Sequence, residues 1–165
     1  MAVNPEIDLA SGFREMQAED VPAILQIEES IYTHPWTEGI FKDCIRVAYN
    51  NWVYTENDTV FAYGLVSVAA NEAHILNLCV SPEKQGQGLG KRMLHKLMQT
   101  AEARGADSIF LEVRVSNVIA QNLYEQEGFN RIGMRKAYYP SSEGREDALV
   151  FAKALNLDSE HQFKS

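Results

Sequence analysis

The segment from Leu76 to Val115 constrains the fold more than any other part of the chain. An apolar run up to Val80 predicts a strand, a glycine-rich loop follows Pro82, and apolar residues then recur at helical spacing from Leu89 to Ala101. Ser108 to Val115 predicts another strand. Two strands joined through a helix need a crossover connection, so we expect them to form a parallel pair in a mixed sheet.

The rest of the chain supplies the other elements of this sheet. Before the crossover we expect a strand at 12–17, helices at 20–32 and 37–48 and a meander of strands at 51–55, 60–69 and 73–80, and after it a helix at 117–127 and strands at 129–139 and 148–153. Asn57-Asp58 and Asn71-Glu72 are the predicted meander turns. The pattern predicts an α/β (α+β) fold, with a mostly antiparallel mixed sheet, one parallel strand pair and about four flanking helices.

Size and charge limit the class of protein. With 165 residues and 45% hydrophobic content, we expect a single domain over 1–165, with a core at about 12–155 and short tails at 1–11 and 158–165. The 15 Lys and Arg against 23 Asp and Glu give a net charge of -8. That charge disfavours nucleic acid and anionic membranes and favours cationic acceptors such as basic peptides.

Cysteine use and hydropathy predict the compartment. Cys44 and Cys79 lack the spacing of a zinc site or a disulfide framework. The sequence has no long apolar run and no signal pattern at its N-terminus. We therefore expect a soluble cytoplasmic protein, and we expect it to be a monomer.

The strongest local motif is Gln85-Gly86-Gln87-Gly88-Leu89-Gly90, at the start of a predicted helix. Glycines let several backbone N–H groups point at one place, and a helix N-terminus adds partial positive charge, so this loop can bind a diphosphate. An ordinary glycine-rich turn is the alternative. A P-loop does not fit, because Lys91-Arg92 follow without a hydroxyl residue.

With Leu78-Cys79-Val80-Ser81-Pro82 before it, this loop resembles the coenzyme A pyrophosphate motif of the GNAT acetyltransferases. The resemblance extends over about 12–155 and implies their acyl-CoA N-acyltransferase fold. Five further segments resemble the RimI-type ribosomal-protein-alanine N-acetyltransferases: Pro35-Trp36-Thr37-Glu38, Leu111-Glu112-Val113-Arg114-x-Ser116-Asn117, Asn122-Leu123-Tyr124-Glu125-x-x-Gly128-Phe129, Tyr138-Tyr139-Pro140 and Gly144-Arg145-Glu146-Asp147-Ala148.

The resemblance implies acetyl-CoA as co-substrate and no metal. Its binding residues would be Leu78, Cys79 and Val80 through their backbone, Gln85, Gly86, Gln87, Gly88, Leu89, Gly90 and Lys91 at the diphosphate, and Asn117 at the pantetheine arm. From its position alone, Asn117 is also a helix N-cap. An acyl-cysteine intermediate on Cys79 is rejected, because no histidine is placed by a motif to activate it.

Two residues are the predicted catalysts. On strand alternation alone, Glu112 would belong to a solvated sheet face, whereas the resemblance implies a general base that removes a proton from the acceptor amine. Tyr124 would ordinarily be a core aromatic, whereas the resemblance implies a general acid for the leaving thiolate.

On the acceptor side, the resemblance places Trp36, Tyr138 and Tyr139 beside the substrate peptide. The expected acceptor is the basic, alanine-first N-terminus of a small-subunit ribosomal protein, the eighteenth. Another protein N-terminus, lysine or small amine is the nearest alternative. A non-catalytic acyl-CoA sensor is a third, but it would not need both Glu112 and Tyr124. His34, His74, His95 and His161 are expected to be surface or turn residues.

Overall fold

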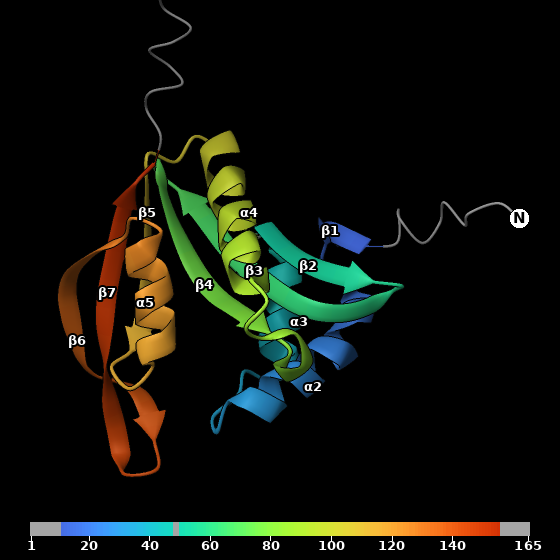
Figure 1. The fold of residues 1–165 in the computed structure, drawn as a ribbon, viewed down its shortest axis with the longest axis horizontal. Coiled ribbons are helices and arrows are strands. Elements are labelled where there is room, and N and C mark those ends of the chain that lie inside the picture. Colours follow the sequence, from blue (N-terminus) through green and yellow to red (C-terminus); the bar gives the residue numbers. More distant parts are fainter. Residues whose placement is uncertain (1–10, 48–49, 156–165) are drawn as a thin grey trace, which may run out of the picture. The chain divides into compact units, whose positions relative to one another are not determined.

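The computed structural model describes residues 11–47 and 50–155, which form seven strands and four α-helices (Figure 1). In chain order the elements are β1 Ser11–Glu15, the 3-10 turn η1 Ala18–Asp20, α2 Val21–Ile31, α3 Glu38–Arg46, β2 Asn50–Glu56, β3 Thr59–Ala69, β4 Glu72–Val80, the 3-10 turn η2 Pro82–Lys84, α4 Leu89–Ala103, β5 Ser108–Arg114, α5 Val118–Gln126, β6 Asn130–Ser141 and β7 Gly144–Ala154.

The sheet has the strand order β1-β2-β3-β4-β5-β7-β6. β4 and β5 run parallel, with Glu72 opposite Ser108 and His74 opposite Phe110. The pairs β1–β2, β2–β3, β5–β7 and β6–β7 are antiparallel. The predicted fold class, including the parallel pair after the crossover, is therefore confirmed.

The chain forms two compact units. The first unit consists of Met1–Val66 and Leu76–Leu97, and the second unit consists of Ser67–Ile75 and Met98–Ser165. β3 and β4 contribute residues to both. No helix among the described residues is long and apolar enough to cross a membrane.

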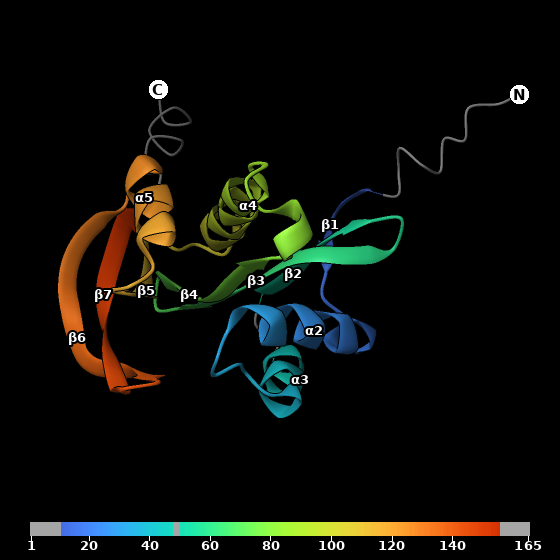
Figure 2. The ribbon, with the colours of Figure 1, turned by 60° about the horizontal axis from the view of Figure 1, so that its bottom comes forward.

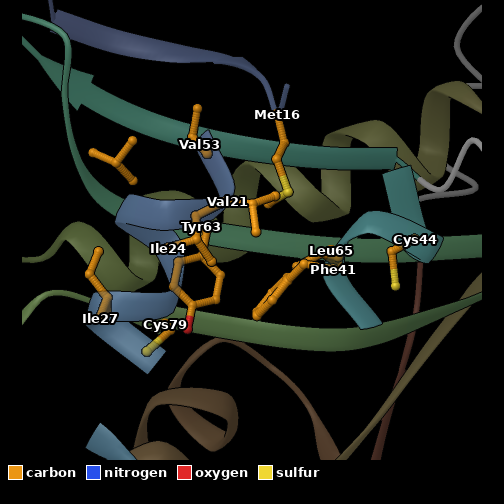
Figure 3. Close-up of a cluster of buried hydrophobic side chains, with 11 residues drawn as sticks. Met16, Val21, Ile24, Ile27, Phe41, Cys44, Val53, Tyr63, Leu65 and Cys79 are labelled. Carbon is orange, nitrogen blue, oxygen red and sulfur yellow. The ribbon is translucent and has the colours of Figure 1, made fainter. Parts of the chain in front are cut away.

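The core of the first unit lies between two helices and one sheet face. Figure 2 shows α2 and α3 on one side of β2 and β3, with α4 on the other side. Figure 3 shows the buried side chains under α2 and α3, among them Val21, Ile24, Phe41, Tyr63 and Leu65. Burying each such side chain contributes roughly 1.5–3 kcal/mol. This apolar layer fixes α2 and α3 on the sheet.

α4 approaches the opposite face at Gly64. Because side chains alternate along a strand, Gly64 faces away from the layer that contains Tyr63 and Leu65. A Cβ at Gly64 would lie 2.9 Å from Leu97 Cδ1 and 3.0 Å from Met93 Sδ. Both of these α4 side chains are fully buried. The glycine therefore lets the helix lie close to β3.

Local signals set most element ends where they were expected. The Thr37 side chain accepts a hydrogen bond from Ile40 N at 3.3 Å and caps α3. Asn57 and Asp58 have φ of 51° and 64°, as a tight hairpin turn requires. The second meander turn was predicted one residue late, because Ala70 and Asn71 are the pair with positive φ.

In the second unit α5 lies alongside β7 (Figures 1 and 2), where the Tyr124 ring is 6.1 Å from the Phe151 ring. β6 and β7 extend further than predicted, to Ser141 and from Gly144. The prediction was short because these strand ends lack apolar alternation.

The predicted first tail is wrong at Ser11, which pairs with Glu56. Residues 1–10 and 158–165 lie outside the described residues.

Replacing Gly64 by valine is expected to lower the free energy of unfolding by about 1–3 kcal/mol, because the added methyl groups would overlap Leu97 and Met93. Urea unfolding measures this change. Gly39→Ala is the control, since Gly39 is an exposed α3 residue whose added Cβ would come no closer than 3.8 Å to Thr37 Oγ1. The control should be neutral or slightly stabilising. Equal stability of Gly64→Val and the parent would contradict the close approach.

Candidate active site

Glu112 lies on the half-buried face of β5. Ile109, Leu111 and Val113 are buried on the other face, as the alternation predicts. The Glu112 side chain is only 8% exposed, so this is not the solvated face of the alternative interpretation. His74 Nε2 lies 2.7 Å from Glu112 Oε1. The carboxylate is thus withdrawn from water and held by an imidazole.

His74 comes from β4, the parallel neighbour of β5. Its Cα is in register with Phe110, two residues before Glu112 on the same strand face. His74 is partly exposed, as expected of a surface histidine, but it lies within a strand and not in a turn, and it contacts the predicted base. The alternation of β4 and β5 was visible in the sequence, but the register that joins them was not.

Tyr139 and Arg114 share the same part of the second unit. The Arg114 guanidinium lies 4.5 Å from the centre of the Tyr139 ring, and its Nη1 donates to Pro140 O at 2.9 Å. Burial, and then the negative charge of Glu112, raise the pKa of the Tyr139 hydroxyl. The phenol therefore stays protonated and can donate a hydrogen bond at neutral pH. The neighbouring Tyr138 ring meets it edge-on at 4.9 Å.

The Gly144–Ala148 segment holds this tyrosine pair in place. Ala137 has a φ of 52°, at an irregularity of the β6–β7 register between Arg135 and Tyr139. Arg145 donates to the carbonyls of Ala137 and Tyr138 at 2.7 and 2.9 Å, and Asp147 Oδ1 accepts from Ala137 N at 2.8 Å. A non-glycine residue with positive φ needs such support.

Glu146 ties the same segment to β5. Its carboxylate accepts from Ser116 N at 2.7 Å and from Arg114 Nη1 at 3.2 Å. These hydrogen bonds, chiefly the one from Ser116, hold the pKa of Glu146 below its usual value. Arg145, Glu146 and Asp147, in the last of the segments that resemble the RimI-type group, therefore hydrogen-bond to backbone groups and hold them in position.

Tyr124 and Asn117 both belong to α5. The Tyr124 side chain is buried, with its ring 5.7 Å from the Phe129 ring. Repulsion between the ionised forms of the two phenols is the last of the causes that raise the pKa of Tyr139, after burial and the charge of Glu112. Asn117 Oδ1 accepts from Ala120 N at 3.1 Å, so the predicted N-cap is confirmed.

The glycine loop is in the first unit, after β4 and the turn η2. Gly86 and Gly88 have φ of 77° and 83°, a conformation that side chains rarely adopt. Gln85 Nε2 donates back to Val80 O at 3.0 Å. α4 starts at Leu89, so the loop delivers the chain to a helix N-terminus, where backbone N–H groups attract anions.

The other predicted co-substrate residues of this unit lie on β4, in the glycine loop and at the start of α4. Leu78 and Val80 are half-buried on β4, Cys79 and Leu89 are buried, Gln85, Gly86, Gln87, Gly88 and Lys91 are exposed, and Gly90 is half-buried. Burial raises the pKa of the Cys79 thiol to about 11, so little thiolate exists at neutral pH. This agrees with the rejection of an acyl-cysteine intermediate.

A buried carboxylate that the sequence analysis did not single out lies beside Cys79. Glu28 on α2 is 2% exposed. Its Oε1 accepts from Tyr63 Oη on β3 and from Asn77 Nδ2 on β4 at 3.1 Å, and its Oε2 accepts from Trp36 N at 2.8 Å. One side chain thus joins α2 to two strands and to the segment before α3. The predicted acceptor-side residue Trp36 is half-buried there, with its ring 5.2 Å from the Phe41 ring.

Comparison with known proteins identifies the family of the chain. The profile described as Acetyltransferase (GNAT) family matches residues 13–129, which is more than half of the chain. The chain therefore belongs to the GNAT family of acetyltransferases.

Two individual relatives show which group within this family the chain resembles. The chain is 37% identical over 142 residues to the [ribosomal protein bS18]-alanine N-acetyltransferase of Escherichia coli strain K12, covering 86% of this chain and 96% of the relative. It is 39% identical over 138 residues to the Haemophilus ducreyi protein of the same name, covering 83% and 95%. The predicted resemblance to the RimI-type group is confirmed.

Solved structures agree with this placement. The crystal structure of the ribosomal-protein-S18-alanine N-acetyltransferase from Escherichia coli matches with a TM-score of 0.82 and 36% identity, over 89% of this chain and 95% of that one. Ard1 from Thermoplasma volcanium matches with a TM-score of 0.80 at 24% identity, over 89% and 99%, and shows the fold alone.

Glu28→Gln is expected to lower the free energy of unfolding by about 1–3 kcal/mol, because the amide nitrogen cannot accept the hydrogen bonds made by one carboxylate oxygen. Urea unfolding tests this. Glu29→Gln removes the same charge at the next, exposed position of α2 and should change stability by less than about 0.5 kcal/mol. If both variants lost the same stability, the buried network would not be the cause.

Proposed function

We propose that this protein transfers the acetyl group of acetyl-CoA to the N-terminal alanine of the small-subunit ribosomal protein bS18. The main support is the similarity to the two relatives that carry this activity in their names, which extends over 95–96% of their length. The acidic character of the chain, with a net charge of -8, suits a basic acceptor peptide.

Glu112 is the proposed general base. The acceptor amine is largely ammonium at neutral pH, and it must lose a proton before its nitrogen can attack. The Glu112 carboxylate takes that proton, directly or through a water, and becomes a carboxylic acid. Its placement supports the role, because the side chain is nearly buried and its Oε1 lies 2.7 Å from His74 Nε2, which orients the carboxylate.

Tyr124 is the proposed general acid. Attack of the amine on the thioester carbonyl forms the new carbon–nitrogen bond, and the carbon–sulfur bond then breaks. The departing thiolate takes the phenolic proton of Tyr124 and leaves as coenzyme A, and the phenolate regains a proton when the attacking nitrogen, now part of the amide, gives up its extra proton directly or through water. The aromatic contacts of Tyr124 with Phe129 and Phe151 would hold the hydroxyl in a fixed direction.

The co-substrate residues are proposed by their chemistry. The backbone N–H groups of Gln85 to Lys91 would bind the diphosphate, since the positive φ of Gly86 and Gly88 suits a loop that presents amides. The β4 backbone at Leu78, Cys79 and Val80 and the Asn117 amide would bind the pantetheine arm. Trp36, Tyr138 and Tyr139 would contact the acceptor peptide.

We also propose that the chain works as one acetyltransferase domain, without a metal, as a monomer in the cytoplasm, and without direct contact to nucleic acid. Another acceptor, such as a different protein N-terminus, a lysine or a small amine, is the alternative within the same chemistry. Family membership favours an enzyme over a non-catalytic acyl-CoA sensor.

The parent protein is expected to release coenzyme A when given acetyl-CoA and a basic peptide that begins Ala-Arg, and Glu112→Gln is expected to reduce that rate by about 10² to 10⁴. The loss should shrink as pH rises, because more of the acceptor amine is then already neutral. Thiol release under conditions where chemistry limits turnover measures both effects.

Two peptides serve as controls for the acceptor. The same peptide with its N-terminus already acetylated tests side-chain lysine, and one that begins with Glu tests general N-terminal activity. Turnover of the blocked peptide at the parent rate would point to a lysine acceptor, and an unchanged rate for Glu112→Gln would refute the base assignment.

Tyr124→Phe is expected to fold normally, to bind acetyl-CoA within a few-fold of the parent, and to lose about 10² or more in turnover, because the hydroxyl contributes mainly in the transition state. Single-turnover rates with saturating acetyl-CoA isolate the step. Were Tyr124 only a core aromatic, the variant would lose some stability and keep the parent rate.

A further inference from the structure

The contact between His74 and Glu112 is a feature of the second unit that the assigned catalytic roles do not explain. His74 Nε2 lies 2.7 Å from Glu112 Oε1. An ionised carboxylate can only accept hydrogen bonds, so the nitrogen that contacts it must carry a hydrogen. The contact therefore fixes Nε2 as the donor and leaves Nδ1 as the nitrogen that can gain or lose a proton.

We propose that His74 is a positioning residue for the catalytic base. Its Nε2–H donates to Oε1 of Glu112, which orients the carboxylate and leaves the other oxygen for the proton of the acceptor amine. This inference rests on the proposed function, since it assigns a role through Glu112.

The burial of the two side chains supports this assignment. Glu112 is 8% exposed, and withdrawal from water disfavours the charged form of a carboxyl group. A hydrogen bond to the charged form acts in the opposite direction, and such bonds to ions are stronger than bonds between neutral groups. His74 is 38% exposed, so the imidazole loses less of its own hydration in making the contact.

The donor does not depend on the protonation state of the imidazole. Nε2 carries a hydrogen both in the neutral tautomer that the contact selects and in the imidazolium form. The same donor is therefore available to Glu112 in either form of the ring. An amide that donates from the same place should be able to replace it.

The other titratable groups in this part of the second unit are common to the parent and to any His74 variant. They include Arg114 on β5, Tyr124 on α5, Arg135, Tyr138 and Tyr139 on β6, and Arg145, Glu146 and Asp147 on β7. A change in the pH dependence of catalysis on replacing His74 would therefore come from the lost imidazole.

The competing explanation is that the contact only stabilises the two strands. The pH dependence of kcat distinguishes this explanation from a positioning role. His74→Leu keeps side-chain bulk and removes the donor, whereas His74→Gln keeps an N–H donor at a similar distance from the backbone. His95→Ala is the control, because His95 is an exposed α4 histidine outside the proposed machinery.

We expect His74→Leu to lower kcat for the Ala-Arg peptide about ten-fold at pH 7 and to move the acidic limb of the kcat profile about one unit to higher pH. The rate should approach the parent rate at alkaline pH. His74→Gln should recover most of the rate at pH 7, and His95→Ala should match the parent. Thermal unfolding of each variant checks that the protein is folded.

A double variant separates failure of this inference from failure of the proposed function. Adding His74→Leu to Glu112→Gln should cause no further loss of rate, because both changes act on one base. If Glu112→Gln alone had no effect, the base assignment itself would fail. If Glu112→Gln were slow but His74→Leu kept the parent pH profile, or if the two losses multiplied, the role of His74 would be overturned. Failure of His74→Gln to recover any rate would overturn the donor role.

Discussion

The parallel pairing of β4 with β5 is the constraint on which the rest of the structure depends. A parallel pair requires the chain to return through a crossover, and here the crossover consists of the glycine loop and α4. The same pairing puts His74 opposite Phe110, which lies two residues before Glu112 on the same face of β5. The parallel direction of this pair therefore accounts for the crossover helix after β4, and its register accounts for the partner of the proposed base.

Polar side chains set positions that apolar packing alone would leave loose. In the first unit, Glu28 takes three hydrogen bonds from separate segments, and each bond has a direction that an apolar contact lacks. In the second unit, Arg145 and Asp147 support a strained residue, Ala137, beside the tyrosine pair. Both networks fix backbone next to residues with proposed contacts to the acceptor peptide.

Much of this architecture could be predicted from the sequence, because the period of the apolar residues changes with each element. The crossover, the cap at Thr37 and the first meander turn all follow from local chemistry. The roles of Glu28 and His74 could not be predicted, because their partners are distant in the sequence. Tyr63 and Asn77 lie 35 and 49 residues from Glu28, and Glu112 lies 38 residues from His74. Spacing along the chain carries no information on such pairs. The last residues of β6, Pro140 and Ser141, and the charged start of β7 were missed because neither shows the apolar alternation of a strand.

The irregular register of β6 has a consequence for the behaviour of the protein in concentrated solution. β6 is the last strand of the sheet, and an edge strand presents unpaired backbone groups that another chain can extend into an aggregate. Its pairing with β7 shifts twice, between Arg131 and Gly133 and between Arg135 and Tyr139, and the positive φ of Ala137 bends the strand further. Arg131, Arg135 and Lys136 also place exposed positive charge along it. A bent and charged edge is a poor template for a second strand, so the same backbone strain that sets the tyrosine pair also protects the sheet from intermolecular growth.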